Sequence, residues 1–310
     1  MEFLGDAVSH ATSVTREVEL SAELANDNGD RPIVSAIAPW FGGNRMLARE
    51  VGRALSGCSW VGVPFMGGGA ELFEIDARAI VANDRHRLLM NLALVIADRS
   101  LGPMLYRRLR RLPFHSDTLE MAQHICDSHK DRDPRRLTRD ESLALAEAYF
   151  VACWAGRSAN AGTVQEFCGG LPVRWNAAGG DSAKRLASAV ESIPAFRRWF
   201  RRCSFLCVDA FDFLDKCKDE PGIGVYVDAP WPGAGDKYRH KFTRDDQERL
   251  AQKLAGFKCS RVVVRFGDHP LIRELYSSSL WEWRELVGRK QSNRESCEVL
   301  LINKSSRGPF

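Results

Sequence analysis

The chain has 310 residues, 45% of them hydrophobic and 27% charged, with a formal net charge of +4 at pH 7, as expected of a soluble globular protein. So small a net charge does not identify a partner, and local clusters of charge must do so instead. The nine cysteines show neither CxxC pairs nor the Cys/His spacing of a metal site, which argues against a disulfide framework and predicts reduced thiols in a cytoplasmic protein without a metal. No apolar run approaches the roughly 18 residues of a membrane-spanning helix, and the start lacks a secretory signal.

The first ordered part of the chain alternates between strand and helix patterns. Residues 60–63 predict a short strand that runs into a glycine-rich loop, and a helix is expected from near Ala70. Residues 79–82 predict a second strand, with Asp84 at its end, and helical spacing returns over about 86–98. This order is typical of the first half of a doubly wound nucleotide-binding sheet.

Two other segments differ from this pattern. Residues 1 to about 30 are polar and mixed in charge, which predicts a flexible tail. Residues 103–202 are expected to be mainly helical, with a loop rich in glycine and aromatic residues over about 154–180. This middle region also holds clusters of arginine: Arg107, Arg108, Arg110, Arg111, Arg135, Arg136, Arg139, Arg197, Arg198, Arg201 and Arg202. Such clusters suit phosphate contacts or, alternatively, a solvated helical face.

The α/β pattern resumes after Ser204. Strands are predicted at 205–208, 225–227, 262–265, 281–286 and 299–302, and helices at about 244–256 and 270–277. The last two strands follow each other too closely for a helical crossover, which predicts that they pair antiparallel.

The glycine-rich loop and the acid after the next strand are the first candidates for a binding site. Gly67, Gly68 and Gly69 let backbone approach a ligand closely, and the loop lacks the GxxxxGK[ST] pattern of a phosphate-binding ATPase loop. Asp84 has the spacing of an acid that binds ribose hydroxyls. The alternative for Asp84 is the N-cap of the helix predicted over 86–98.

A second acid follows a later strand. Asp209, with Phe211 two residues on, offers a carboxylate and an aromatic ring that suit an adenine ring. The alternative is that Asp209 caps a short helix over about 210–216.

The most informative residues are Asp228-Ala229-Pro230-Trp231, which follow a strand-like run and so lie where ligands bind in open α/β sheets. Proline stiffens the turn, and the indole offers a flat face for stacking. The amine of adenine is a poor nucleophile because its lone pair is delocalised into the ring. A carboxylate and a backbone carbonyl that accept its two N–H bonds would draw density onto nitrogen and orient the lone pair toward an electrophilic methyl group.

Four motifs together resemble the Dam-type DNA adenine-N6 methyltransferases, the alpha group with a DPPY motif, and most closely those of phages and mobile elements. They are Trp40-Phe41-Gly42-Gly43-Asn44-Arg45, Pro64-Phe65-Met66-Gly67-Gly68-Gly69, Asn83-Asp84 and Asp228-Ala229-Pro230-Trp231. The stretch from Asn293-Arg294-Glu295 to Asn303 is similar to the last strand of that family. The similarity extends over about residues 35–303, and no second subunit is needed to complete this order of motifs.

The resemblance implies a Rossmann-like sheet that binds S-adenosylmethionine, formed by 31–102 and 203–310 with an antiparallel last strand. The region 103–202 would be an inserted, mainly helical target-recognition domain that binds double-stranded DNA. The residues expected to bind the cofactor are Trp40, Phe41, Gly42, Phe65, Gly67, Gly69, Asp84, Asp209 and Phe211.

The same resemblance assigns roles around the target base. Asp228 would accept one amine hydrogen bond and the Ala229 carbonyl the other, Pro230 would hold the turn, and Trp231 would stack on a base flipped out of the duplex. The family has Pro and Tyr where this chain has Ala229 and Trp231, and Lys where it has Asn44.

Other activities fit the same motifs. The geometry serves a cytosine-N4 or RNA amine as well as adenine, and a DNA-binding relative without catalysis would also keep the fold. No Pro-Cys pair stands near a strand end, which argues against cytosine-C5 methylation.

Overall fold

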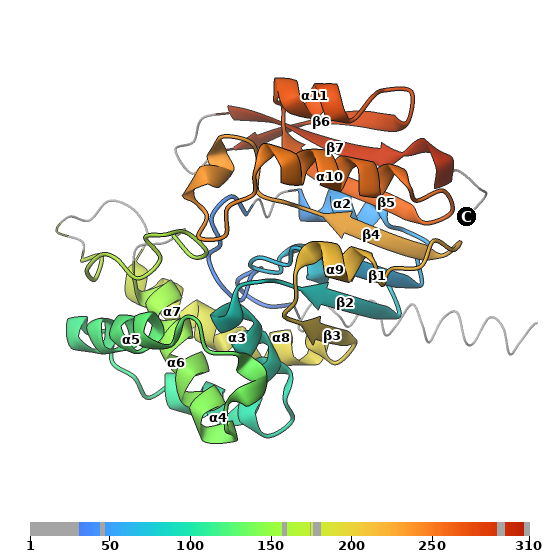
Figure 1. Cartoon of the computed structure of the whole chain (residues 1–310). Helices are drawn as coiled ribbons and strands as arrows, with labels where there is room; N and C mark the ends of the chain where they lie inside the picture. The colour runs from blue at the N-terminus through green and yellow to red at the C-terminus, as the bar shows by residue number, and fades with distance from the viewer. Residues whose placement is uncertain are drawn as a thin grey trace, which may run out of the picture.

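The computed structural model describes residues 31–43, 47–156, 160–173, 175, 181–289 and 295–306. The predicted tail, the Asn44-Arg45 pair and Asn293-Arg294 lie outside the described residues. Within the described ranges, one sheet of seven strands forms the centre of the molecule, and a group of helices lies beside it (Figure 1).

The sheet has the strand order β3-β2-β1-β4-β5-β7-β6. The strands are β1 (Trp60–Val63), β2 (Ala79–Asn83), β3 (Cys203–Leu206), β4 (Ile223–Val227), β5 (Arg261–Gly267), β6 (Trp281–Arg289) and β7 (Glu295–Asn303). The first five in space are parallel, whereas β7 is antiparallel to both β5 and β6. The predicted α/β sheet with an antiparallel last strand is therefore confirmed.

Both faces of the sheet are covered, as the apolar character of its parallel strands requires. Side chains alternate along β4: Tyr226 joins the core under α2 and α3, whereas Val225 and Val227 join the core under α9, α10 and α11. Each such side chain, once buried, stabilises the fold by about 1.5–3 kcal/mol. The helices are α2 (Ala48–Ala54), α3 (Arg87–Ala97), α9 (Ala210–Leu214), α10 (Arg244–Ala255) and α11 (Pro270–Leu275).

Between α3 and β3 the chain is helical, as predicted. This part contains α4 (Leu101–Leu109), α5 (Ser116–His129), α6 (Arg139–Ala155), α7 (Ser182–Glu191) and α8 (Ile193–Phe200). Helix α6 lies at its centre, in contact with α3, α4, α5 and α7, and is apolar around most of its circumference because neighbours cover it on several sides. A capping box between Thr138 and Glu141 starts it. The domain boundaries at 102–103 and 202–203 stay a prediction.

The helix expected from near Ala70 is wrong, because only one 3₁₀ turn, η2 (Glu71–Phe73), forms there. About ten residues separate the glycine loop from β2, and they must reverse the chain within that length. They also pack closely on α2, where a Cβ at Gly52 would lie 2.1 Å from the Glu74 carbonyl oxygen. A full helix does not fit in this space.

No single helix in the described part of the chain is long and apolar enough to cross a membrane. Helices α3 and α4 pass that test only when taken together, and they are bent by 105° relative to each other.

Candidate active site

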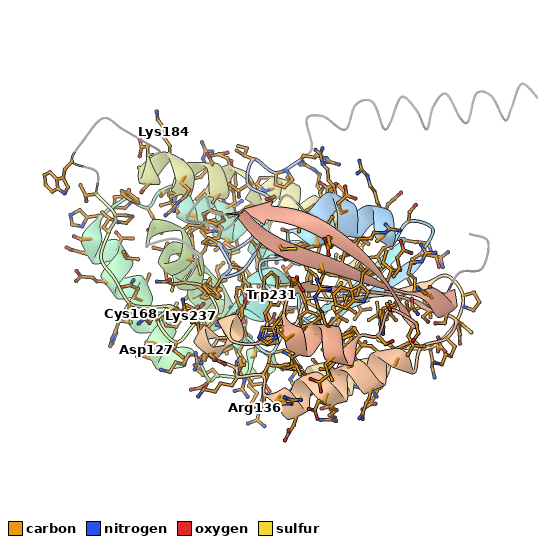
Figure 2. All side chains as sticks on the ribbon, turned by 90° about the horizontal axis from the view of Figure 1, so that it is seen from above. Asp127, Arg136, Cys168, Lys184, Trp231 and Lys237 are labelled. Atoms are coloured by element: carbon orange, nitrogen blue, oxygen red, sulfur yellow. The ribbon has the colours of Figure 1, made fainter. Side chains whose placement is uncertain are left out.

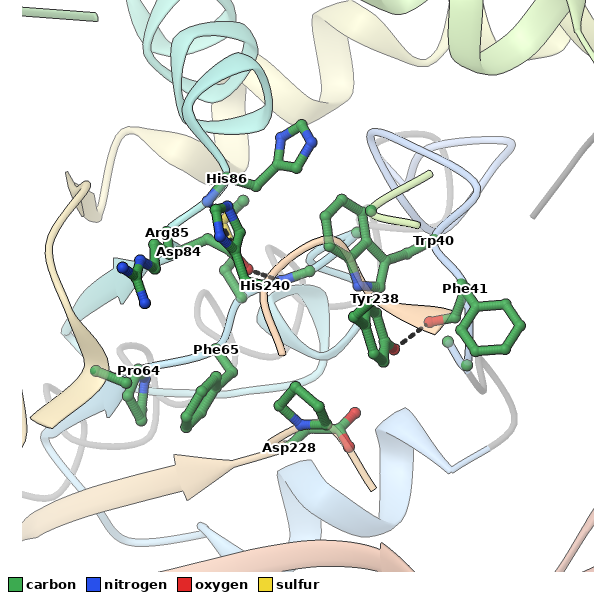
Figure 3. Close-up of a pocket in the computed structure, with 18 of the residues that line it drawn as sticks. Trp40, Phe41, Pro64, Phe65, Asp84, Arg85, His86, Asp228, Tyr238 and His240 are labelled. Carbon is green, nitrogen blue, oxygen red and sulfur yellow. Dashed lines mark hydrogen bonds between the residues drawn. The ribbon is translucent and has the colours of Figure 1, made fainter. Parts of the chain in front are cut away.

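A cavity of about 900 Å³ opens at the carboxyl ends of β1, β2 and β4. Most of the residues predicted for the site line it: Trp40, Phe41, Gly42, Phe65, Gly67, Gly69, Asp84, Asp209, Phe211, Asp228 and Pro230. Figure 3 shows Asp228 near Phe65, with Trp40 and Tyr238 across from Asp84 and His240. The structure therefore brings together residues that are up to about 190 positions apart in the sequence, as expected when parallel strands end at one edge.

Asp84 joins the glycine loop to the start of α3. Its Oδ2 accepts a hydrogen bond from the Gly67 amide at 2.9 Å, and its Oδ1 accepts one from the His86 amide at 2.9 Å. Burial raises the pKa of this carboxyl, although the two amides oppose that effect. His86, not Asp84, caps α3, because its Nδ1 accepts from the Leu89 amide. The N-cap alternative for Asp84 is therefore wrong.

Two glycines enclose the indole of Trp40. A Cβ at Gly67 would lie 2.9 Å from Trp40 Cδ1, and one at Gly162 would lie 2.4 Å from Trp40 Cζ2. Both glycines have positive φ angles, of 51° and 83°. The backbone of Phe41 also donates to the Ala161 carbonyl at 3.2 Å. The wall of the cavity at Trp40 thus depends on close backbone approach from two separate loops.

We expect Gly162→Ala to lower the free energy of unfolding by about 1–3 kcal/mol more than a matched control, because its methyl group would overlap the Trp40 ring. The control is Gly169→Ala, which also places alanine at a positive φ, of 112°, but meets no atom within 4 Å. Urea denaturation of both variants measures the difference. Equal losses would mean that backbone strain alone matters at Gly162.

A segment that we call the strap, residues 237–242, crosses one side of the cavity. The Tyr238 hydroxyl donates to the Phe41 carbonyl at 2.6 Å, and the Arg239 amide donates to the Gly162 carbonyl at 3.0 Å. The carbonyl of Lys237 accepts from the Val164 amide. The strap is therefore tied both to the first motif and to the loop after α6.

The other end of the cavity is aromatic. The ring of Phe242 stacks on Phe211, with centroids 6.1 Å apart and planes at 9°, and meets Phe65 edge-on at 5.7 Å. The guanidinium of Arg249 lies 3.9 Å from the centre of the Phe211 ring. Asp209 caps α9 by accepting from the Phe211 amide, so the capping alternative is confirmed, and Asp209 lines the cavity as well.

Asp228 is held by two donors at the end of β4. Its Oδ2 accepts from Arg265 Nη1 at 2.8 Å, and its Oδ1 accepts from Trp231 Nε1 at 3.2 Å. Burial raises the pKa of Asp228, and Arg265 opposes this effect. Arg265 is 1% exposed and also donates to the Glu298 carboxylate at 2.9 Å and to the Gly42 carbonyl at 3.2 Å. This one guanidinium therefore connects β4, β5, β7 and the first motif.

Trp231 and Ala229 do not line the cavity. The indole of Trp231 packs on Gly267, where a Cβ would lie 2.8 Å from Cε3, and the Arg265 guanidinium lies 5.3 Å from the centre of the ring. In the view from above, Trp231 lies nearer to the long strands of the sheet than Lys237 does (Figure 2). Ala229 is buried at 1% exposure. Gln247 on α10 donates to the Pro230 carbonyl at 2.7 Å and supports the turn.

A second buried polar cluster lies behind Trp40. His86 Nε2 and the Tyr149 hydroxyl bond the two oxygens of Glu166, at 2.8 and 2.7 Å. Burial alone would raise the pKa of Glu166, but its contacts with His86 and Tyr149 outweigh burial and lower that pKa. The ring of His86 meets Trp40 edge-on at 5.5 Å. The cluster therefore supports the Trp40 side chain from behind.

Sequence reasoning missed several residues of the site: Glu71, His86, Glu166, Tyr238, Phe242, Arg265 and Glu298. One signal was available for Arg265, because a lone arginine interrupts the apolar run of β5 and a buried arginine requires acidic partners. Among the described residues, no group of three or more His, Cys, Asp or Glu side chains has the arrangement of a metal site.

Comparison with known proteins identifies the family. Residues 40–290 match the family described as D12 class N6 adenine-specific DNA methyltransferase, and no curated protein matches the chain. The matched range covers most of the chain and contains all four motifs. The seven-stranded sheet, parallel except for its last strands, agrees with the Rossmann-like methyltransferase fold. The chain therefore belongs to the D12 class N6 adenine-specific DNA methyltransferases, which methylate adenine in DNA.

Proposed function

We propose that this protein transfers a methyl group from S-adenosylmethionine to the N6 amine of adenine by direct in-line attack, on a base flipped out of double-stranded DNA. The observation that carries the proposal is the position of Asp228, which lies at the end of β4 and lines the same cavity as the glycine loop and Asp84. A nucleophile and a methyl donor can meet there without a covalent enzyme intermediate.

The residues around the cavity fit S-adenosylmethionine, which supplies an electrophilic methyl group when bound. The positive φ angles of Gly67 and Gly69 leave backbone where a Cβ would project, which permits close approach of a ligand. We assign the ribose hydroxyls to Asp84, whose oxygens each keep a lone pair beyond the amide bonds described above. The adenine of the cofactor belongs at the aromatic end, with Phe65 and Phe211. Trp40, Phe41 and Gly42 would contact the methionine part.

Asp228 and the Ala229 carbonyl would accept the two hydrogen bonds of the target amine. Both oxygens of Asp228 already accept one bond each, but a carboxylate has about four acceptor positions, so the amine can still be bound. Held in this way, the nitrogen presents its lone pair toward the methyl group, and the fixed donors around Asp228 keep the carboxylate in place without reorganisation. Trp231 would stack on the flipped base once that base enters from the side of the indole.

The helical region between α3 and β3 would bind the DNA. Its arginine clusters suit phosphate oxygens, which position the protein without reading sequence and make binding sensitive to salt. The proposed limits of this target-recognition domain are residues 103 and 202. We expect the remaining parts, 31–102 and 203–310, to form the catalytic domain.

Transfer of labelled methyl groups from S-adenosylmethionine to unmethylated DNA, followed by mass spectrometry of the nucleosides, tests the proposal. The expected product is N6-methyldeoxyadenosine. Label in N4-methylcytosine would change the target base and keep the mechanism. An absence of label on DNA and RNA, with S-adenosylmethionine still bound, would refute catalysis and leave a DNA-binding relative.

A further inference from the structure

One arginine lies within ion-pair distance of three carboxylates near the end of β4. The Arg265 guanidinium lies 2.8 Å from Asp228, 2.9 Å from Glu298 and 3.8 Å from Glu71. The side chains of Arg265, Glu298 and Glu71 are only 1%, 5% and 11% exposed. Because a buried charge is costly unless it is paired, an acid of this cluster that Arg265 does not bond directly needs positive charge from another source when it is ionised.

Glu71 is the acid that Arg265 supports least. The guanidinium forms hydrogen bonds with Asp228, with Glu298 and with the Gly42 carbonyl, whereas its 3.8 Å separation from Glu71 is too long for a hydrogen bond. Glu71 also lines the cavity, which Glu298 does not. The positive charge that balances Glu71 would therefore be supplied from the cavity side.

We propose that Glu71 binds the positive charge of the methyl donor. S-adenosylmethionine carries two cationic groups, a sulfonium and an α-ammonium, and either can serve as the counter-charge of this carboxylate. Glu71 directly follows the glycine loop, with Gly69 and Ala70 also lining the cavity, so the assignment places it beside the bound cofactor. This inference rests on the proposed use of S-adenosylmethionine and adds a specificity residue to it.

The protonation of Glu71 agrees with this assignment. Burial and the nearby Asp228 raise the pKa of Glu71 to about 7, although Arg265 opposes them. Tyr226 on β4 is the other titratable group beside it. Near neutral pH the carboxyl therefore takes up either a proton or an external cation. It follows that S-adenosylmethionine should bind more tightly as the pH rises toward and above 7, and that binding should release a proton.

Isothermal titration with three ligands tests the proposal. The ligands are S-adenosylmethionine, which has both cationic groups, S-adenosylhomocysteine, which has only the ammonium, and 5′-methylthioadenosine, which has neither. We expect Glu71→Gln to raise the Kd for S-adenosylmethionine about tenfold or more and to leave 5′-methylthioadenosine nearly unchanged. The matched control is Glu74→Gln, which removes a negative charge three residues further along, from a side chain that pairs with Arg31 at 3.1 Å and does not line the cavity, and which should change each Kd less than about threefold.

The pattern of losses identifies the cationic group. A loss for S-adenosylmethionine and S-adenosylhomocysteine together supports the ammonium, and a loss for S-adenosylmethionine alone supports the sulfonium. Equal losses for all three ligands, or none, would overturn the role of Glu71. Failure of the unaltered protein to bind S-adenosylmethionine would instead refute the proposed function, and this inference with it.

Thermal unfolding gives a second readout that does not depend on activity. Because the pKa of Glu71 lies above its ordinary value of 4.5 in the folded protein, its contribution to stability is lost as the pH rises from about 4.5 to about 7. Glutamine does not titrate. The melting temperature of Glu71→Gln minus that of the unaltered protein should therefore be larger at pH 8 than at pH 5. If this difference is the same at both pH values, Glu71 is not ionised at pH 8 without adequate pairing, and the assignment is contradicted.

Discussion

Replacing Asp228 with asparagine is expected to lower the rate of methyl transfer by about 10²–10³-fold, while S-adenosylmethionine still binds. Both partners of Asp228, Trp231 Nε1 and Arg265 Nη1, are hydrogen-bond donors. The amide group of asparagine would have to face one of these donors with its own N–H bonds. The substitution therefore removes the negative charge and also misplaces the acceptor that the target amine requires.

The matched control for this experiment is Asp212→Asn. Asp212 also lines the cavity, but it is exposed and holds no assigned role in the transfer. Single-turnover transfer with saturating S-adenosylmethionine separates the chemical step from binding. Asp228→Asn with the same single-turnover rate as the control would show that another group accepts the amine hydrogen bond.

Replacing Arg265 with methionine is expected to have the largest effect on stability, a loss of about 3–5 kcal/mol in the free energy of unfolding. The change keeps apolar volume but leaves Asp228, Glu298 and Glu71 buried without their shared cation. Lysine at this position should recover only part of the loss, because its ammonium cannot reproduce the planar set of bonds that the guanidinium makes to carboxylates on two strands.

The comparison for Arg265 is Arg273→Met. Arg273 bonds Asp268 through two nitrogens, at 2.7 and 2.8 Å, but its side chain is 53% exposed, so its loss should cost less than about 1 kcal/mol. Urea denaturation measures both variants. The double variant Arg265→Met with Glu298→Gln should be more stable than Arg265→Met alone, because it removes one of the buried charges that lose this cation. Equal effects of the two arginine substitutions would argue against the shared-cation role.

Much of the fold could be predicted because buried parallel strands leave short apolar runs in the sequence. The predicted strand at 60–63 agrees with β1, and the short connection before the last strand correctly indicated antiparallel pairing. The strand predicted at 205–208 begins two residues earlier, at Cys203, because β3 is an edge strand whose residues alternate between partial burial and exposure.

The site could be predicted only in part, since its residues follow strands whose ends meet. Acids after strands were recognisable one by one, and the parallel sheet explains why Asp84 and Asp228 line one cavity. The orientation of Trp231 could not be predicted, because it depends on the lack of a side chain at Gly267, on another strand. Likewise, the role of Arg265 depends on partners from β4 and β7 that only the register of the sheet brings together.

The parallel pairing of β1 with β4 has a consequence for how the protein folds. Trp60 lies beside Ile223, and the Ser59 hydroxyl donates to the carbonyl of Gly222, which is 163 positions further along the chain. Closing so long a loop lowers the chain entropy before the contacts of the sheet can form and offset that loss. Slow folding is therefore expected. During synthesis, the glycine loop leaves the ribosome long before Asp228 and Arg265 do. The cofactor cavity therefore cannot be completed until most of the chain has been translated. Until β4 is made, the edge of β1 that pairs with it stays unpaired.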